Sequence, residues 1–146
     1  MDTATPNKGY RWIKILGIIL MSGYIIVYLL IFLGDTKGKK LQYDQAHGIY
    51  YSEEYFDPSF IREIGNVFVE IKYFLPDNAL DVQIYRSQEL GDTVVVGYIV
   101  DENKLTPEAS QGFKEITRAI LPLLRTHTKV ALKDEDFNTL EEMLVE

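Results

Sequence analysis

The strongest hydrophobic feature of the chain is an uncharged run from Ile15 to Gly34. Trp12 to Leu33 is 22 residues long, and as an α-helix it would measure about 33 Å, enough for a bilayer core of about 30 Å. No small-residue cleavage motif follows the run, so we expect a retained anchor rather than a signal peptide. The pattern predicts a tail at 1–11, a single-pass transmembrane helix at 12–33 and localisation at the lipid bilayer. Three basic residues flank each side, so the positive-inside rule leaves the sidedness open.

Gly17, Met21, Tyr24 and Tyr28 fall on one stripe of this predicted helix, which thus combines a glycine with two tyrosines. A tyrosine hydroxyl in the middle of an apolar run needs a hydrogen-bond partner, and a glycine lets a second backbone approach. We therefore expect a transmembrane packing face for other membrane protein subunits. A plain lipid anchor that tolerates the tyrosines is the alternative.

The remainder of the chain alternates between polar and apolar stretches. Residues 34–48 are polar and contain glycine, which predicts a tether, and residues 49–146 form a small acidic domain. The domain begins with an aromatic stretch around two glutamates, and its aromatic residues are Tyr50, Tyr51, Tyr55 and Phe56. The stretch is either a short strand or a docking segment. Its aromatic residues serve either the core of the domain or contact with a partner protein, and these alternatives stay open.

Helical signals are clear after Asp57. Asp57 is placed as an N-cap, Pro58 suits the first helical position, and apolar residues then recur on one stripe up to Leu75, before Pro76. This predicts a helix over 58–75. A strand over residues 66–75 is the competing interpretation, because that stretch is rich in β-branched and aromatic residues.

Further along, strands and helices alternate. Alternating apolar residues predict strands at 80–86 and 128–133, and a continuous apolar run predicts another at 93–100. Thr106 and Pro107 begin a helix that Pro122 should kink or end, and Asp134 should cap a last helix up to Leu144. The fold class is therefore α+β: a three-stranded mixed sheet with about three helices in the order α-β-β-α-β-α, with right-handed crossovers.

Charge is distributed unevenly. The net charge is -7; residues 1–40 hold six Lys or Arg against two acidic residues, or +4, and residues 41–146 hold nine against twenty, or -11. An acidic domain repels phosphate backbones, so nucleic-acid binding is not expected. The chain has no cysteine, which excludes disulfides, thiol catalysis and thiolate metal sites.

Catalytic signatures are missing from the sequence. His47 and His127 lie eighty residues apart without a carboxylate at metal-ligand spacing, which is typical of loop histidines. No nucleophile elbow or glycine-rich phosphate loop occurs. We therefore expect no enzymatic activity, no cofactor, no metal and no small-molecule substrate.

Two functions fit these features. The first is a membrane-anchored protein-interaction or assembly module, an accessory subunit of a membrane protein complex. The alternative is a membrane-bound regulator, sensor or immunity-type inhibitor that acts on a basic partner, because the acidic domain complements positive charge.

Overall fold

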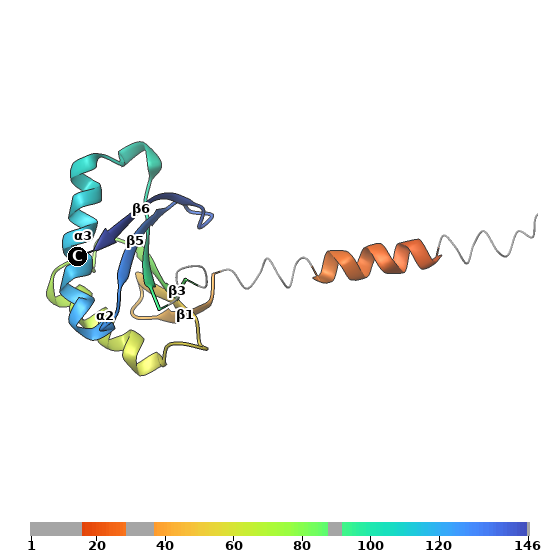
Figure 1. Cartoon of the computed structure of the whole chain (residues 1–146), viewed down its shortest axis with the longest axis horizontal. Coiled ribbons are helices and arrows are strands. Elements are labelled where there is room, and N and C mark those ends of the chain that lie inside the picture. The colour runs from red at the N-terminus through yellow and green to blue at the C-terminus, as the bar shows by residue number, and fades with distance from the viewer. Residues whose placement is uncertain (1–15, 29–36, 88–91, 146) are drawn as a thin grey trace, which may run out of the picture. The chain divides into compact units, whose positions relative to one another are not determined.

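A computed structural model describes residues 16–28, 37–87 and 92–145 of the chain (Figure 1). The chain divides into two compact units, Met1–Thr36 and Lys37–Glu146. The first contains a helix over residues 16–28, and the second contains a six-stranded sheet with two α-helices.

The 16–28 helix contradicts the transmembrane prediction. No helix in the described parts of the chain combines the length and the apolar character needed to cross a membrane. The predicted span at 12–33 and the membrane localisation that rested on it are therefore wrong; residues 12–15 and 29–33 lie outside the described residues.

The sheet follows the order of the chain. Its strands are β1 (Lys39–Gln42), β2 (His47–Tyr51), β3 (Leu80–Arg86), β4 (Val94–Ile99), β5 (Thr128–Lys133) and β6 (Thr139–Val145), each beside its neighbours in sequence. Pairing alternates along the sheet: β1–β2, β3–β4 and β5–β6 are antiparallel, whereas β2–β3 and β4–β5 are parallel. Three hairpins are thus joined side by side through parallel pairs.

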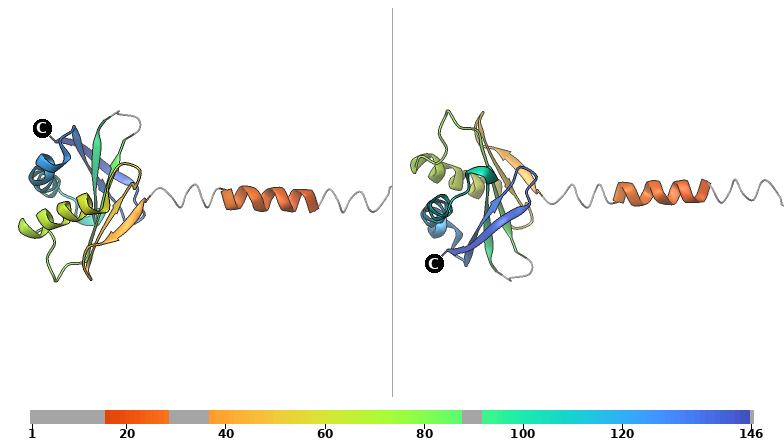
Figure 2. Two further views of the ribbon diagram at one scale, coloured as in Figure 1. Left: turned by 90° about the horizontal axis from the view of Figure 1, so that it is seen from below. Right: turned by 90° about the horizontal axis from the view of Figure 1, so that it is seen from above.

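Each parallel pair is bridged by a helix. Helix α2 (Pro58–Glu70) connects β2 to β3, and α3 (Pro107–Leu124), preceded by the 3-10 turn η1 (Glu102–Lys104), connects β4 to β5. Both helices cover the same face of the sheet (Figure 2). The opposite face, here termed the open face, carries no helix of this unit.

This arrangement requires two crossovers of opposite hand. The pair β2–β3 and the pair β4–β5 run in opposite directions, because β3 and β4 are antiparallel. Both connections nevertheless move to the next strand in the same direction across the sheet. Tyr98 of β4 contacts both Phe68 of α2 and Thr117 of α3, so both helices lie on one face. One crossover is therefore left-handed, contrary to the expected right-handed rule. The exception allows the two helices to share one core.

Local signals placed α2 and α3 correctly at their starts. Asp57 accepts a hydrogen bond from the Ser59 amide, and Thr106 accepts one from the Ala109 amide, each before a proline. Helix α2 ends at Glu70 rather than at the predicted residue 75, because Lys72 adopts a φ of 61°. The chain then folds back so that the amides of 73 and 74 donate to the carbonyl of Phe68.

The predicted three-stranded sheet and the order α-β-β-α-β-α are wrong. Strand β1 lies within the predicted tether, β2 begins in the last two residues of the tether and continues into the aromatic stretch, and β6 replaces the predicted last helix. Asp134 does not cap a helix; its carboxylate accepts hydrogen bonds from the amides of Asp136 and Asn138 and closes a tight turn. Beyond this turn Met143 and Val145 face the helices in a two-residue period, so the segment pairs with β5 as a strand.

The core lies between the sheet and the two helices. It contains Ile49, Tyr51, Val82, Ile84, Val96, Tyr98, Val130 and Leu132 from the sheet, with Ile61, Ile64, Phe68 and Ile120 from the helices. The Tyr98 hydroxyl, fully buried, donates to Thr117 Oγ1 at 2.8 Å, and Thr117 donates to the carbonyl of Phe113 at 2.9 Å. Burial strongly raises the pKa of Tyr98, so the phenol stays a protonated donor.

The Tyr98–Thr117 bond gives the first prediction. Thr117→Val keeps the volume but leaves the buried hydroxyl without an acceptor, which should lower the free energy of unfolding by about 1–3 kcal/mol in urea titrations. Adding Tyr98→Phe to Thr117→Val should recover part of that loss, because no polar group is then left unpaired. A double variant that is less stable than Thr117→Val alone would contradict this account.

Candidate functional site

The strand directions bring four connecting segments to one end of the sheet. They are residues 43–46, 76–79, 100–106 and 134–138. Acidic residues are concentrated in these segments and in β3 beside them: Asp44, Asp77, Asp81, Asp101, Glu102, Asp134, Glu135 and Asp136. This region is here termed the acidic end. It collects eight acidic residues that are scattered over more than half of the chain.

Only part of this negative charge is paired. Lys40 lies 3.1 Å from Asp81, and Lys104 lies 3.4 Å from Asp101. Asp77, Glu102, Glu135 and Asp136 form no ion pair with any described residue. The acidic end therefore keeps a surplus of negative charge.

A groove of about 520 Å³ opens at the acidic end. Its walls include Lys40, Gln42, Asp81, Asp101 and Glu135, together with apolar side chains such as Ile99. Carboxylates and amides beside an apolar side chain suit a ligand group that is both cationic and partly apolar, such as the end of a lysine or arginine side chain.

The turn that carries Glu135 and Asp136 is held by Asp134. Asn138 Nδ2 donates to Asp134 Oδ2 at 2.8 Å, and the amides of Asn138 and Asp136 donate to Oδ1 at 2.8 and 3.0 Å. These hydrogen bonds, of which the one from the Asn138 side chain contributes most, lower the pKa of Asp134. The acidic residues of the turn are therefore presented by an ordered backbone.

The same turn is fastened onto the open face. The backbone of Phe137 has a φ of 68°. Its ring packs edge to face against the ring of Tyr50, with 5.0 Å between the ring centres, and Lys37 Nζ lies 4.6 Å from the centre of the Phe137 ring. Lys133 donates to the Phe137 carbonyl at 3.3 Å and covers Gly97, where a β-carbon would lie 3.1 Å from the lysine chain. Burial lowers the pKa of Lys133. Lysine contacts thus anchor the turn without neutralising Glu135 or Asp136.

A second hollow, of about 390 Å³, adjoins the groove and shares Gln45 and Ala46 with it. His47 lines it, is 1% exposed and stacks on Phe74 at 4.3 Å. Its Nδ1 donates to Asp44 at 2.7 Å, a hydrogen bond that is the main cause of the lowered pKa of Asp44. His47 Nε2 is buried and has no partner among the described residues.

His47 begins β2, so the prediction of a loop histidine is wrong, and its pairing with Asp44 was not predicted from the sequence. The signal in the sequence for this pair was the spacing of three residues between Asp44 and His47, across a turn. No group of three or more metal-ligating side chains gathers in the described residues. The pair fastens the 43–46 turn to the sheet and so positions Asp44 and Gln45 at the acidic end.

The structure separates the four aromatic residues of the predicted partner contact. Tyr51 and Phe56 are buried in the core, at 1% and 9% exposure. Tyr50 is half-buried on the open face, and Tyr55 is 38% exposed, with the guanidinium of Arg86 5.4 Å from its ring centre. Only Tyr50 and Tyr55 are therefore accessible, and contact between them and a partner stays a prediction.

The predicted transmembrane packing face lies on the 16–28 helix. Met21, Tyr24 and Tyr28 are 60–73% exposed, and nothing lies within 4 Å of a β-carbon built on Gly17. Packing of these four residues against another helix within a membrane rested on the predicted span, which is contradicted.

The hydrogen bonds of Asp134 predict a pH dependence. Asp134→Ala should lower the free energy of unfolding at neutral pH, and the difference from the parent chain should shrink as pH falls from about 5 to about 2. The sign follows because a carboxyl with a lowered folded-state pKa stabilises the fold above its unfolded pKa of 3.8 and loses that contribution as pH falls through the folded value. Urea titrations at several pH values measure it.

The matched control for that experiment is Glu63→Ala on α2, whose carboxylate has no hydrogen bond or ion pair with a described residue. Its difference from the parent chain should stay small throughout. If the difference in free energy of unfolding between Asp134→Ala and the parent chain does not change with pH, the role given to the Asp134 carboxylate is contradicted.

Comparison of the chain with protein-family models, with curated proteins and with solved structures finds no significant match. A function for the chain must therefore be inferred from its own residues and their geometry.

Proposed function

We propose that residues 37–146 form a protein-binding module that recognises a positively charged partner through the acidic end of its sheet. The supporting observation is the concentration of eight acidic residues at one end of the sheet, where Asp81, Asp101 and Glu135 line a groove. Four of the eight have no ion pair with a described residue, namely Asp77, Glu102, Glu135 and Asp136. Charge that is not used within the fold is available to a partner.

The overall charge supports the same function. Residues 37–146 carry twelve basic and twenty acidic residues, or -8. Such a field accelerates the encounter with a positive surface and repels acidic competitors. The domain therefore favours basic partners before any contact is made.

The groove supplies the contact itself. A lysine or arginine side chain entering it would meet Asp101 and Glu135 with its charged end and Ile99 with its methylene groups. Because the turns at the acidic end are held by backbone amides that donate to the carboxylates of Asp44 and Asp134, little ordering is needed on binding. A role as a regulator or inhibitor of a basic protein follows from this mode of recognition.

Assembly with other subunits is the second candidate, and the 16–28 helix favours it. Its large apolar side chains, Leu16 to Tyr28, are 52–73% exposed. Contiguous exposed apolar surface marks an interaction site in most proteins. The helix would then join the module to an apolar surface of another protein.

A truncated chain tests this second candidate. Removal of residues 1–36, at the boundary between the two units, should leave a cooperative thermal transition, because the core lies entirely within Lys37–Glu146. If the helix drives assembly, the full chain should sediment as an oligomer and the truncated chain as a monomer. Equal association states would remove the helix from the assembly role.

Charge-neutralised variants test the acidic end. Glu135→Gln with Asp136→Asn should weaken binding of a short lysine-rich peptide by about 2- to 30-fold, since each exposed ion pair contributes about 0.2–1 kcal/mol. Affinity should also fall as salt rises from about 0.05 to 0.3 M. Fluorescence anisotropy with a labelled peptide measures both effects.

The control removes the same charge elsewhere. Glu54→Gln with Glu63→Gln alters the loop after β2 and helix α2, away from the acidic end. Peptide affinity should then change by less than about twofold. Equal losses for both pairs of substitutions would show a response to net charge alone and would contradict a defined site.

A further inference from the structure

We propose that the free edge of β6 receives an extended segment of the basic partner as a seventh strand. The segment that fits pairs antiparallel and has two apolar residues followed by two basic residues. This inference rests on the proposed function and specifies the form in which the partner binds.

Among the described residues, strand β6 forms one edge of the sheet. The strand has seven residues and is last in the sheet, and no described strand pairs with its outer side. An edge strand offers a row of backbone donors and acceptors to an added strand. The acidic turn 134–138 leads directly into β6, so the edge is continuous with the acidic end.

The hydrogen-bond pattern identifies the groups that point outward. The amides of Val94 and Val100 donate to the carbonyls of His127 and Lys133, so odd-numbered residues of β5 bond to β4. The backbone groups of even-numbered residues of β5 therefore point toward β6. There they bond to the backbone groups of their partners Glu141, Met143 and Val145. The backbone N–H and C=O groups of Glu142 and Leu144 must then point away from the sheet.

The two edges of the sheet differ in their protection. Strand β1 has four residues, two of which are lysines that pair with Glu53 and Asp81. Short length and lysines are devices that discourage strand addition. Strand β6 is longer and has neither lysine nor proline, so it is the edge that is suited to pairing.

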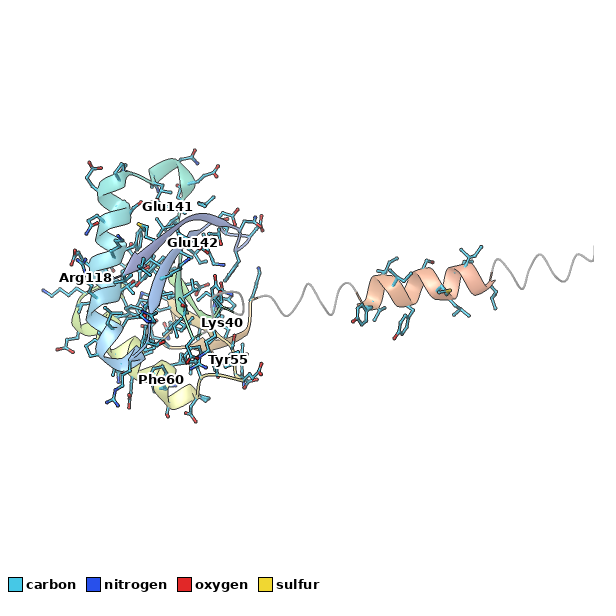
Figure 3. All side chains as sticks on the ribbon, in the orientation of Figure 1. Lys40, Tyr55, Phe60, Arg118, Glu141 and Glu142 are labelled. Atoms are coloured by element: carbon cyan, nitrogen blue, oxygen red, sulfur yellow. The ribbon has the colours of Figure 1, made fainter. Side chains whose placement is uncertain are left out.

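The side chains of β6 define the sequence that fits. Glu141 and Glu142, both labelled in Figure 3, are consecutive residues of β6, so their side chains lie on opposite faces of the strand. Met143 and Leu144 follow them. Glu141 accepts a hydrogen bond from Ser110 at 2.8 Å, Glu142 lies 3.5 Å from Lys129, and Leu144 is 49% exposed. In an antiparallel neighbour, two apolar residues would face Leu144 and Met143, and two basic residues would then face the glutamates.

A second copy of the chain fits less well. Antiparallel pairing of two β6 strands about their midpoint would set Glu142 of one copy opposite Glu142 of the other. Like charges directly opposite each other destabilise a strand pair. Charge complementarity therefore favours a basic segment of a different protein.

A peptide with the order valine, isoleucine, lysine, lysine, flanked by threonines, tests the inference on the full chain. Binding should slow hydrogen exchange at the amides of Glu142 and Leu144, which face solvent in the free protein. Leu144→Pro removes one outward N–H while leaving the bonds to β5, and should weaken binding at least about tenfold more than Leu144→Ala. A thermal melt checks that Leu144→Pro is folded.

The same peptide N-methylated at alternate residues provides a test that needs no protein variant. It keeps its charge but loses backbone donors, and it should bind at least about tenfold more weakly. Equal binding of the methylated and parent peptides, or unchanged exchange at Glu142 and Leu144, would overturn the inference.

The outcomes separate this inference from the proposed function. Binding that stays salt-dependent and sensitive to Glu135→Gln with Asp136→Asn, but not to Leu144→Pro, would reject the edge and keep the acidic end. Equal binding of a peptide with glutamines in place of both lysines, with the same protection of Glu142 and Leu144, would keep strand addition and reject the preference for basic partners.

Discussion

Burial of a single face of the sheet is the constraint on which the domain depends. Tyr98 stands at its centre, fully buried, with rings of Phe68 and Phe113 from the two helices against it and its hydroxyl bound to Thr117. Because α2 and α3 share this face, their two crossovers have opposite hands. A left-handed connection is the consequence of one common core for both helices.

This one-sided packing exposes the groups that are available for binding. The open face is covered in part by the 134–138 turn, through Phe137 on Tyr50 and Lys133 on the Phe137 carbonyl. The edge of β6 stays unpaired beside it. Since the strands alternate between hairpins and parallel pairs, four loops gather at one end, and the acidic residues gather with them.

Stability and recognition use different carboxylates at the acidic end. Asp44 accepts hydrogen bonds from the His47 ring and from backbone amides, and Asp134 accepts them from the Asn138 side chain and from backbone amides. These bonds hold the two turns, and the side-chain bonds are the main cause of the lowered pKa of each carboxyl. Glu135 and Asp136 make no ion pair with a described residue, so their charge is free to act on a partner. A basic side chain in the groove would use the carboxylates of the acidic end, whereas a basic strand on the β6 edge would use the neighbouring Glu141 and Glu142.

The sequence by itself determined the elements whose signals are local. Asp57 with Pro58 and Thr106 with Pro107 marked the helix starts, and strict alternation marked β3 and β5. The tertiary structure decided β1 and β6, because a strand such as Thr139–Val145 is stabilised by its neighbour rather than by its own pattern. It also decided between a strand and a docking segment at the start of the aromatic stretch, where β2 lies. The net charge can be counted from the sequence, but the gathering of acidic residues at one end of the sheet cannot. Strand order and direction are properties of pairing between distant residues, and they alone brought Asp81, Asp101 and Glu135 together.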